Sequence, residues 1–589
     1  MEDKITYFAE ANFRGLNKKF GIKKPDRRKH MYVVGKTGMG KTTLLENMAM
    51  QDIRNGEGMA FIDPHGDTAA KLLNFVPESR IEDVIYFDPA DTDFPIGFNV
   101  MENIDPERRH FVASGLMGVF KKIFGPDVWS ARMEYILNNT VLALLEYPGS
   151  TLLNINPMLA VKEFRKRVVE SVTDPVVKAF WTQEFAKYTE RFAAEATPAI
   201  QNKVGQFTSN SLIRNIVGQS KSAFDFRKAM DEKKILIINL AKGRVGEDAA
   251  RLLGAMIVTK LYLAAMSRVD QPDEEKRPDF FLYVDEFQNF ATESFANILS
   301  EARKYRLSLI LAHQYMAQLD ETVRDAVIGN VGTMVAFRVG AEDAEFLEKE
   351  FSPEFVAQDV VNLGFAGIYL KLMIDGIASR PFSATTLKPI KIEESSFKEE
   401  ILASSRKIYG SARSDVEKRI IEWQETLDKD SASSSEKSEK PKFPDTRPKF
   451  EGVCAVCGTK IQVPFEPDPS RPIFCKDHLG MSSQYRPPVP KPSFTPPKPA
   501  FSPPPVEPRR ESPRTFSTPR LPQKENDGFI SLKNLRRPPP ATPRPQEKNS
   551  DLSALREALK KSMEKSKEVI PKQEEGGAKT LKPGDKIEI

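Results

Sequence analysis

Short, continuous runs of apolar residues recur between residues 31 and 63 and again after residue 234. In the first stretch, an apolar run (MYVV) precedes a glycine-rich turn, a helix-like pattern (TTLLENMAMQDI) and a second apolar run (MAFIDP). Apolar runs of this length, bounded by turn residues, predict buried strands. Because strands that alternate with helices usually pair in parallel, we expect a parallel sheet covered on both faces.

The later apolar runs predict further strands at KILIINLA (234–241), FFLYVDE (280–286), LSLILAHQ (307–314), TMVAFRV (333–339) and AGIYLKLM (366–373). Between residues 105 and 230 the apolar positions instead recur with a helical period. The sequence therefore predicts one α/β domain in two pieces, 31–104 and 231–390, with a mostly parallel central sheet. An all-helical domain is inserted at 105–230.

The two ends of the chain differ from this core. Residues 1–30 form a basic segment, either a solvated arm or a phosphate-contacting surface, crowded with Lys18, Lys19, Lys23, Lys24, Arg27, Arg28 and Lys29. The other end divides into a helical segment (391–428), a linker (429–450), a cysteine-bearing module (451–480) and a tail (481–589). The tail has 19 prolines in the 59 residues from 487 to 545. This density predicts disorder and a role in binding other proteins, with a short helix near 551–568.

Composition and charge narrow the class of protein only a little. The net charge of +5 is small for 589 residues and does not by itself indicate a nucleic-acid partner. No stretch has the ~18 to 20 consecutive apolar residues that span a bilayer, and the first residues lack the pattern of a signal peptide. We therefore expect a cytoplasmic protein. The three cysteines lie close together, which excludes a disulfide framework and favours a local metal site.

The segment GKTGMGKT matches the phosphate-binding loop G-x-x-x-x-G-K-[ST], and it lies between a predicted strand and a predicted helix. Glycines let several backbone N–H groups point at one anion, and the helix N-terminus favours negative charge. Lys41 supplies a charge for the β- and γ-phosphates, and the Thr42 hydroxyl binds Mg²⁺. The nucleotide-contacting residues that we expect are Gly35, Lys36, Thr37, Gly38, Met39, Gly40, Lys41, Thr42, Thr43 and Asp285.

Polar residues at the ends of two later strands are the candidates for hydrolysis of ATP. Asp285 and Glu286 follow FFLYV, and we expect Asp285 to hold Mg²⁺ and Glu286 to orient and polarise the attacking water. Gln314 ends LSLILAHQ, where its amide can contact the γ-phosphate or the water, whereas His313 is more typical of a structural residue. Two arginines could stabilise charge in the transition state, Arg303 before this strand and Arg338 after TMVAF.

Cys454, Cys457, Cys475 and His478 form the pattern C-x2-C-x17-C-x2-H. Three thiolates and one imidazole at this spacing are typical of a structural, tetrahedral zinc site. A module of about thirty residues with so little core needs such a site in order to fold. The pattern resembles a zinc ribbon, and its contact with either nucleic acid or protein stays open.

These motifs occur in the order HMYVVGKTGMGKTTLL, FIDPHGD, FLYVDEFQNF, EARKYRLSLILAHQ and FRVGAEDAEFL, over about residues 25 to 390. Together they resemble the TraG/TraD group of coupling ATPases of conjugation and type IV secretion, within the HerA/FtsK superfamily. The resemblance implies a RecA-like P-loop motor that pumps DNA as a ring of six subunits, with ATP between subunits. It also implies that Arg303 acts on a neighbour's nucleotide, and it matches Asp63 and Asp67 of FIDPHGD without assigning them a role.

The resemblance thus predicts an ATP-hydrolysing motor that translocates single- or double-stranded DNA without sequence preference, with ATP, Mg²⁺ and structural Zn²⁺. Family members often begin with transmembrane helices, so this chain would need a membrane or secretion-channel partner to recruit it to the inner membrane. Two alternatives stay open at this point. One is a soluble HerA-like helicase or translocase in repair, and the other is a scaffold that binds ATP without hydrolysing it.

Overall fold

The computed structural model describes residues 4–481, except 14–15, 103, 126–127, 190–196, 393–395, 437–449 and 464. The chain divides into two units, Met1–Arg447 and Pro448–Ile589, and each is described by itself. The expected proline-rich tail and its helix near 551–568 lie outside the described residues, as does most of the expected linker.

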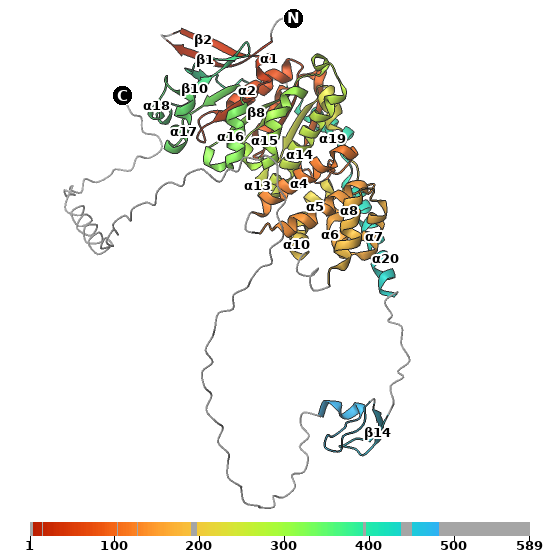
Figure 1. Cartoon of the computed structure of the whole chain (residues 1–589). Coiled ribbons are helices and arrows are strands. Elements are labelled where there is room, and N and C mark those ends of the chain that lie inside the picture. Colours follow the sequence, from red (N-terminus) through yellow and green to blue (C-terminus); the bar gives the residue numbers. More distant parts are fainter. Residues whose placement is uncertain are drawn as a thin grey trace, which may run out of the picture. The chain divides into compact units, whose positions relative to one another are not determined.

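An 11-stranded sheet forms the centre of the first unit, in the order β2-β1-β13-β10-β9-β3-β8-β7-β4-β6-β5 (Figure 1). The strands from β9 to β5 are all parallel: β3 (Met31–Val34), β4 (Gly58–Asp63), β5 (Val84–Phe87), β6 (Ile235–Asn239), β7 (Phe280–Val284), β8 (Leu307–His313) and β9 (Thr333–Ala336). The strands at the other edge pair antiparallel: β1 (Ile5–Phe13), β2 (Leu16–Lys23), β10 (Gly367–Lys371) and β13 (Phe382–Thr386). The predicted α/β fold with a mostly parallel central sheet is confirmed.

Both faces of this sheet are buried, which is why its central strands are continuously apolar. In β7, Phe281 and Tyr283 contribute to a core that includes α2 (Lys41–Arg54). The alternate residue Leu282 contributes to a second core, which includes α14 (Glu247–Ser267) and the helices after residue 105. Alternation along the strand therefore distributes one apolar run between two helical layers.

Helices and helical turns follow one another in the described part of residues 105–230. The α-helices are α4 (Arg109–Phe124), α5 (Ala131–Glu146), α6 (Ile155–Ala160), α7 (Lys162–Ser171), α8 (Pro175–Ala179), α10 (Pro198–Ser209), α11 (Ser211–Val217) and α12 (Phe226–Asp231). Ser130 begins α5 because its side chain accepts a hydrogen bond from the Met133 N–H, which satisfies a free donor of the first turn. The helix α4 packs against both α14 and α5. Where this region begins and ends as a domain stays a prediction.

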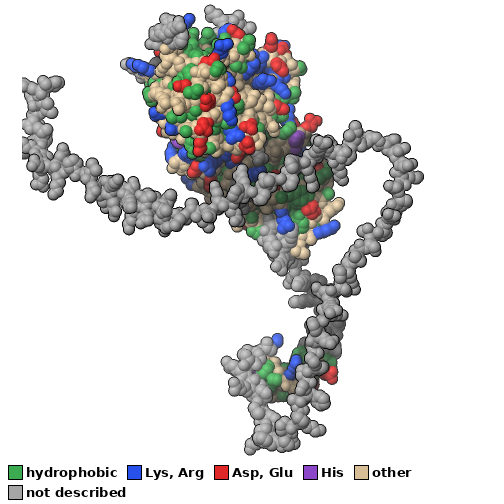
Figure 2. All heavy atoms as spheres, turned by 60° about the vertical axis from the view of Figure 1, so that its left-hand side comes forward, with side chains coloured by type: hydrophobic (Ala, Val, Ile, Leu, Met, Phe, Trp, Pro, Cys, Tyr) green, Lys and Arg blue, Asp and Glu red, His purple; other side chains and the backbone are tan. Residues whose placement is uncertain are grey.

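The remaining elements of the first unit are short or lie at its surface. They are α1 (Lys24–Arg27), α3 (Asp67–Leu72), α13 (Lys242–Val245), α15 (Glu293–Glu301), α16 (Glu321–Asn330), α17 (Ala341–Phe351), α18 (Ala357–Val361), β11 (Met373–Ile374), β12 (Ile377–Ala378), α19 (Lys398–Tyr409) and α20 (Arg413–Glu436). Over the face shown in Figure 2, basic and acidic side chains are intermixed, in keeping with the small net charge.

Among the described residues, α14 and the turn after it (Glu247–Asp270) are long and apolar enough to cross a membrane. Inside the protein, 72% of its most apolar window is buried, so α14 serves here as a core helix. Counting strictly consecutive apolar residues overlooks this helix, because Lys260 interrupts the run.

The polypeptide after β13 is attached to the helix that follows the glycine-rich loop. The Asn47 side chain in α2 donates to the carbonyl oxygens of Leu387 (3.3 Å) and Lys388 (3.0 Å) and accepts from the Ile390 N–H (3.1 Å). Beyond this point, α19 packs against β5, and α20 packs against α7 and α11.

The second unit is a small module around two short strands, β14 (Phe450–Val453) and β15 (Lys460–Val463), which pair antiparallel. A 3₁₀ helix, η12 (Lys476–Met481), follows a bridge between Cys454 and Ile473.

Candidate functional site

The glycine-rich loop joins the end of β3 to the start of α2. Gly40 has φ 113°, a conformation that side-chain-bearing residues rarely adopt. A Cβ atom on Gly35 would lie 2.5 Å from Phe337 Cβ, so only glycine fits between the loop and the end of β9. The Lys41 ammonium is buried and donates to the Gly35 carbonyl oxygen (2.7 Å), which places it inside the curve of the loop. Burial lowers the pKa of Lys41, and the nearby carboxylates of Glu286 and Asp285 oppose this effect.

The acidic pair after β7 lies beside this loop. Because β3, β8 and β7 are adjacent and parallel, their carboxyl ends meet at one edge of the sheet. The Thr42 hydroxyl donates to Asp285 Oδ2 (3.0 Å), and Asp285 is 3% exposed. Burial, together with the nearby charge of Glu286, raises the pKa of Asp285 to about 6. A hydroxyl and a buried carboxylate are oxygen ligands of the kind that Mg²⁺ prefers, so this donor set fits Mg²⁺.

Glu286 is held at both carboxylate oxygens. Gln314 Nε2 donates to Oε1 (2.9 Å) and Gln288 Nε2 donates to Oε2 (2.8 Å). The Glu286 backbone is left-handed (φ 48°), a strained conformation for a residue other than glycine and one that is concentrated at functional sites. The sequence predicted Glu286 and Gln314 but not Gln288, whose only signal is its position two residues after the carboxylate.

The remaining candidates are Arg303, Arg338 and His313, and only Arg303 lies away from the glycine-rich loop. Arg303 is exposed in the turn η10 (Ala302–Tyr305) before β8, and Gln314 follows the other end of that strand. Since β8 has seven residues, about 20 Å separates the two ends, and the chain does not bring Arg303 to its own glycine-rich loop.

Arg338 lies at the loop, because its carbonyl oxygen accepts from the Lys36 N–H (2.8 Å). His313 is fully buried and bonded to the Tyr32 hydroxyl, and burial lowers its pKa to about 3. His313 is therefore neutral, as a structural residue would be.

Asp63 of the FIDPHGD segment shapes a turn. Its carboxylate accepts from the His65 N–H (2.8 Å) and the Ala69 N–H (2.9 Å), and Asp63 is 2% exposed. Asp67 is exposed at the start of α3. The buried aspartate thus fixes the path of the chain from β4 into α3.

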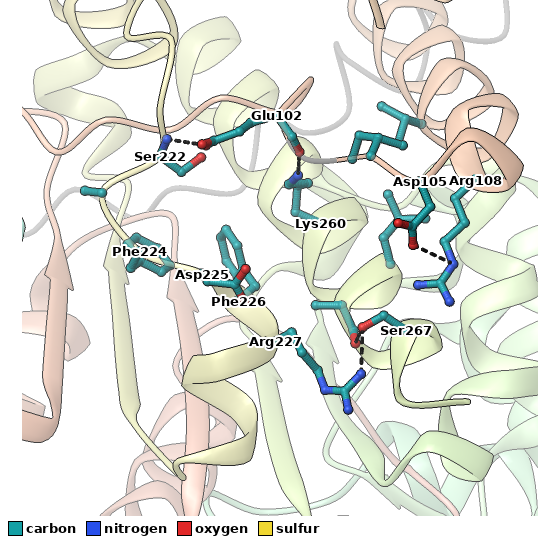
Figure 3. Close-up of a pocket in the computed structure, with 15 residues that line it drawn as sticks. Glu102, Asp105, Arg108, Ser222, Phe224, Asp225, Phe226, Arg227, Lys260 and Ser267 are labelled. Atoms are coloured by element: carbon teal, nitrogen blue, oxygen red, sulfur yellow. Dashed lines mark hydrogen bonds and ion pairs between the residues drawn. The ribbon is translucent and has the colours of Figure 1, made fainter. Parts of the chain in front are cut away.

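A hollow of about 330 Å³ lies where the chain leaves the sheet for the helices (Figure 3). Lys260 Nζ donates to the Glu102 carbonyl oxygen (3.0 Å), the Ser222 N–H donates to the Glu102 carboxylate, and Arg227 donates to Ser267 Oγ (3.0 Å). Burial lowers the pKa of Lys260 to about 8. Two segments connect the sheet with the helical region, one at Glu102 and one at residues 222–227, and these contacts attach both segments to α14. The hollow shares no residue with the glycine-rich loop.

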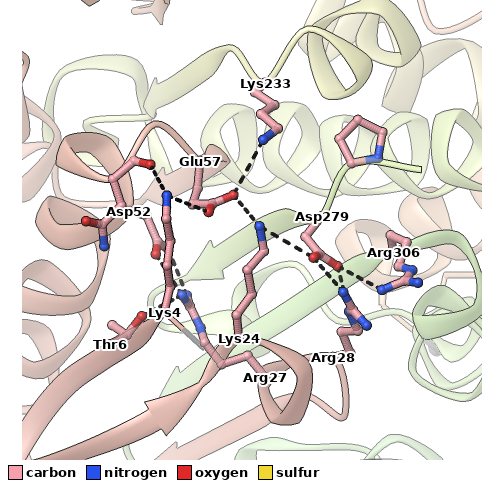
Figure 4. A network of polar contacts seen from close by, with 12 residues as sticks. Lys4, Thr6, Lys24, Arg27, Arg28, Asp52, Glu57, Lys233, Asp279 and Arg306 are labelled. Carbon is pink, nitrogen blue, oxygen red and sulfur yellow. Dashed lines mark hydrogen bonds and ion pairs between the residues drawn. The ribbon is translucent and has the colours of Figure 1, made fainter. Parts of the chain in front are cut away.

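The basic segment at the N-terminus is built into the fold beside the amino ends of the parallel strands, since its partners Glu57 and Asp279 directly precede β4 and β7 (Figure 4). The Arg27 guanidinium donates twice to Asp52 (2.6 and 2.7 Å), once to the Tyr283 hydroxyl (2.7 Å) and once to Thr6 Oγ1 (2.9 Å). It also lies 3.6 Å from the centre of the Phe281 ring. Burial disfavours its charge, but Asp52 and Tyr283 outweigh that effect and raise the pKa of Arg27 above its ordinary value.

Two further cations of this segment form ion pairs beside Arg27 (Figure 4). Lys24 pairs with Glu57 (2.7 Å), and Arg28 donates twice to Asp279 (2.8 and 2.9 Å). Both carboxylate side chains are 5% exposed. Neither a solvated arm nor a phosphate-contacting surface describes Lys24, Arg27 and Arg28. Their ion pairs join α1 to α2 and to the residues that precede β4 and β7.

His30 follows this network and precedes β3. Its Nε2 donates to the Leu299 carbonyl oxygen (3.1 Å), and its Nδ1 accepts from the Leu309 N–H (3.1 Å). This pattern requires the neutral ring, and burial lowers the pKa of His30 to about 4.

In the second unit, the four predicted zinc ligands come together. Their ligand atoms all lie within 4.8 Å of one another, with Cys457 Sγ 3.8 Å from Cys475 Sγ and Cys475 Sγ 3.1 Å from His478 Nδ1. Zinc–sulfur bonds of about 2.3 Å at tetrahedral angles place two thiolates about 3.8 Å apart, so the cluster fits Zn²⁺. Cys454 and Cys457 lie at the turn between β14 and β15, whereas Cys475 and His478 lie at the start of η12.

Comparisons with known proteins match part of each unit. Residues 19–366 match the family described as the type IV secretion-system coupling protein DNA-binding domain, and residues 447–479 match a probable treble clef zinc finger. The second description is a treble clef zinc finger where the sequence predicted a zinc ribbon, and the matched residues include all four predicted ligands.

Individual relatives are distant. The type 4 coupling protein DotL of Legionella pneumophila is 21% identical over 415 residues, covering 60% of this chain and 53% of DotL, so the chain spans about half the length of that relative. Among solved structures, the bacterial conjugative coupling protein TrwB has a TM-score of 0.46 and 14% identity over 65% of this chain and 90% of its own. VirB4 of Thermoanaerobacter pseudethanolicus has a TM-score of 0.42 and 14% identity over 68% and 99%. Because the first family model covers more than half of the 589 residues, this chain belongs to the type IV secretion-system coupling protein DNA-binding domain family.

Proposed function

We propose that this chain is an ATPase that couples ATP hydrolysis to the movement of DNA through a type IV secretion system. The observation that carries the proposal is a pair of side-chain hydrogen bonds, Thr42 to Asp285 and Gln314 to Glu286. These bonds join three segments that are distant in the sequence at one edge of the sheet. A site for nucleotide binding alone has no need of a carboxylate held at both oxygens beside a phosphate-binding loop.

The residues divide the work by position. Lys41 and the N–H groups of residues 35–43 would bind the phosphates, and Thr42 with Asp285 would hold Mg²⁺. Bound Mg²⁺ neutralises charge that develops on the phosphates during hydrolysis. Glu286, fixed by two amides, would orient the attacking water and accept its proton. Gln314 would contact the γ-phosphate or the same water.

Arg303 would complete the site of a neighbouring subunit. It is exposed and lies at the end of β8 away from its own loop, so it can act only on a nucleotide bound by another copy. This placement supports a ring of several subunits, and six is the number that the resemblance implies.

The match to a DNA-binding domain family supports DNA as the translocated substrate. Binding would be independent of sequence and weakened by salt, as expected for contacts to backbone phosphates. The chain would act at the cytoplasmic side of the inner membrane, recruited by a membrane or secretion-channel partner. Zn²⁺ would be held by the four ligands of the second unit as a closed, structural site.

The test is ATP hydrolysis by the full chain with no DNA, single-stranded DNA or double-stranded DNA over a salt series. We expect DNA to raise the rate, with the stimulation falling as salt rises. Glu286→Gln should retain ATP binding and lose hydrolysis by about 100-fold or more, because general-base catalysis contributes ~10² to 10⁴. Equal rates in the wild type and Glu286→Gln would refute the assigned base and favour a scaffold that only binds ATP. A DNA-stimulated ATPase that moves DNA without any secretion partner would instead favour a translocase in repair.

A further inference from the structure

The second unit carries a groove of about 850 Å³ beside the zinc cluster. Its apolar lining consists of Ile461, Val463, Phe465, Pro472, Ile473 and Phe474. Phe465 is 54% exposed, a large aromatic surface for a module of about thirty residues. An exposed aromatic side chain within an apolar groove marks a surface that binds another chain segment.

The charge of the module disfavours nucleic acid as that ligand. Between residues 450 and 480 there are three cationic and four acidic side chains, and a Zn²⁺ ion bound by three thiolates adds one more negative charge. Contact with phosphates requires an excess of lysine and arginine. Glu466 and Asp468 follow Phe465 along the groove, and neither forms an ion pair within the described part of the module. Arg471 and Lys476 line the groove elsewhere.

We propose that this groove holds the proline-rich segment 485–506 of the same chain. The segment has ten prolines between 487 and 505, carries Arg486, Lys491 and Lys498, and contains no acidic residue. Proline-rich segments bind grooves lined by aromatic side chains because their extended helix is preformed and loses little entropy. Cations between the prolines match the acidic side chains next to Phe465.

The distance along the chain is short enough for the segment to return to its own module. The described module ends at Met481 and the first proline of the segment is Pro487. Six residues reach about 20 Å when extended. A short tether gives an effective concentration in the millimolar range. Even an intrinsic Kd of ~100 µM would then leave about ten chains in eleven docked at ~1 mM.

Limited digestion of the full chain with chymotrypsin tests this proposal. Phe494 and Phe501 lie inside the segment, whereas Phe516 and Phe529 lie in the same tail beyond it and serve as an internal reference. Rates are compared at the same bond between variants. We expect Phe465→Ala to accelerate cleavage after the two inner phenylalanines by about 5- to 10-fold, as the docked fraction falls, and to leave the two outer sites unchanged.

Glu466→Lys should have the same effect in a smaller measure, without removing an apolar contact. Val456→Ala is the matched control, since Val456 is 44% exposed on the same module and does not line the groove. One zinc per chain in each variant shows that the module remains folded. Unchanged cleavage in Phe465→Ala with zinc retained overturns the proposal. Protection that disappears on dilution also overturns it, because the occupant would then come from a second copy.

Discussion

The buried pair of Arg27 and Asp52 gives a prediction that separates a structural role from DNA contact. The two side chains are 3% and 1% exposed. Replacing Arg27 by methionine fills part of the space but leaves the Asp52 carboxylate buried, with the Tyr283 hydroxyl (2.5 Å) as its one remaining side-chain donor among the described residues. Removing one partner of a buried ion pair typically costs about 3–5 kcal/mol of folding stability. We expect a loss of that size in the free energy of unfolding of Arg27→Met.

The double variant Arg27→Met/Asp52→Leu sharpens the prediction. Replacing both partners of a buried ion pair by apolar residues is often neutral or stabilising, by as much as about 1–4 kcal/mol. The double variant should therefore regain most of the stability that either single variant loses. The assay is urea unfolding followed by circular dichroism, with the slope of each transition compared so that a change in unfolding mechanism is recognised. The coupling energy follows from the four midpoints and slopes.

Lys18→Met is the matched control, because Lys18 belongs to the same basic segment but is exposed on β2. It should change stability by less than about 0.5 kcal/mol. The reasoning is refuted if Arg27→Met unfolds at the wild-type urea concentration. It is also refuted if the double variant is no more stable than the two single losses added together.

Three further outcomes test other parts of the chain. Lys41→Ala should weaken binding of a fluorescent ATP analogue by about 100-fold, because charge-assisted hydrogen bonds worth ~1.5–3 kcal/mol each are lost, and unchanged affinity would contradict the loop assignment. Mixing inactive Arg303→Ala with inactive Glu286→Gln should restore part of the ATPase rate, since some interfaces then contain an intact Glu286 from one subunit and an intact Arg303 from its neighbour. If no activity returns, the role of Arg303 at a neighbour's nucleotide loses its support. His30 binds a proton in the unfolded chain near pH 6.5 but in the folded chain only near pH 4, so stability should fall as the pH drops below 6.5, by about 2 kcal/mol at pH 5, and urea unfolding of His30→Gln should lack that part of the loss.

The strands that the sequence predicted best are those buried on both faces of the sheet. The strands β3, β4, β6, β7, β8 and β9 are buried on both faces, and this burial requires continuous apolar runs that stand out in the sequence. The strands β1, β2, β5 and β13 were not predicted. In β2 the residues LNKKFGIK carry the lysines that often protect an edge strand from unwanted pairing, so the strand was interpreted as part of a basic arm.

At the nucleotide site, too, residues within a local motif were predicted and contacts between distant segments were not. Lys41, Thr42 and Asp285 follow from local motifs, because the loop and the end of a strand each fix their residue types over a few positions. Contacts between segments could not be predicted in this way. The hydrogen bond from Gln288 to Glu286 depends on the turn after β7, and the position of Arg303 relative to the loop depends on the direction of β8.

The three hydrogen bonds of Asn47 have a mechanical consequence. The helix α2 starts at the lysine of the phosphate-binding loop, and Asn47 in its second turn is hydrogen-bonded to residues 387–390. Two helices follow these residues along the chain, α19 and then α20, and α20 contacts α7 and α11 of the helical region. A displacement of α2 must either break these hydrogen bonds or pull on the chain that leads from residue 390 to α20. The chain therefore leads from the phosphate-binding helix to α19, which packs against β5, and on to α20, so that the state of the phosphates can exert force on helices far from them.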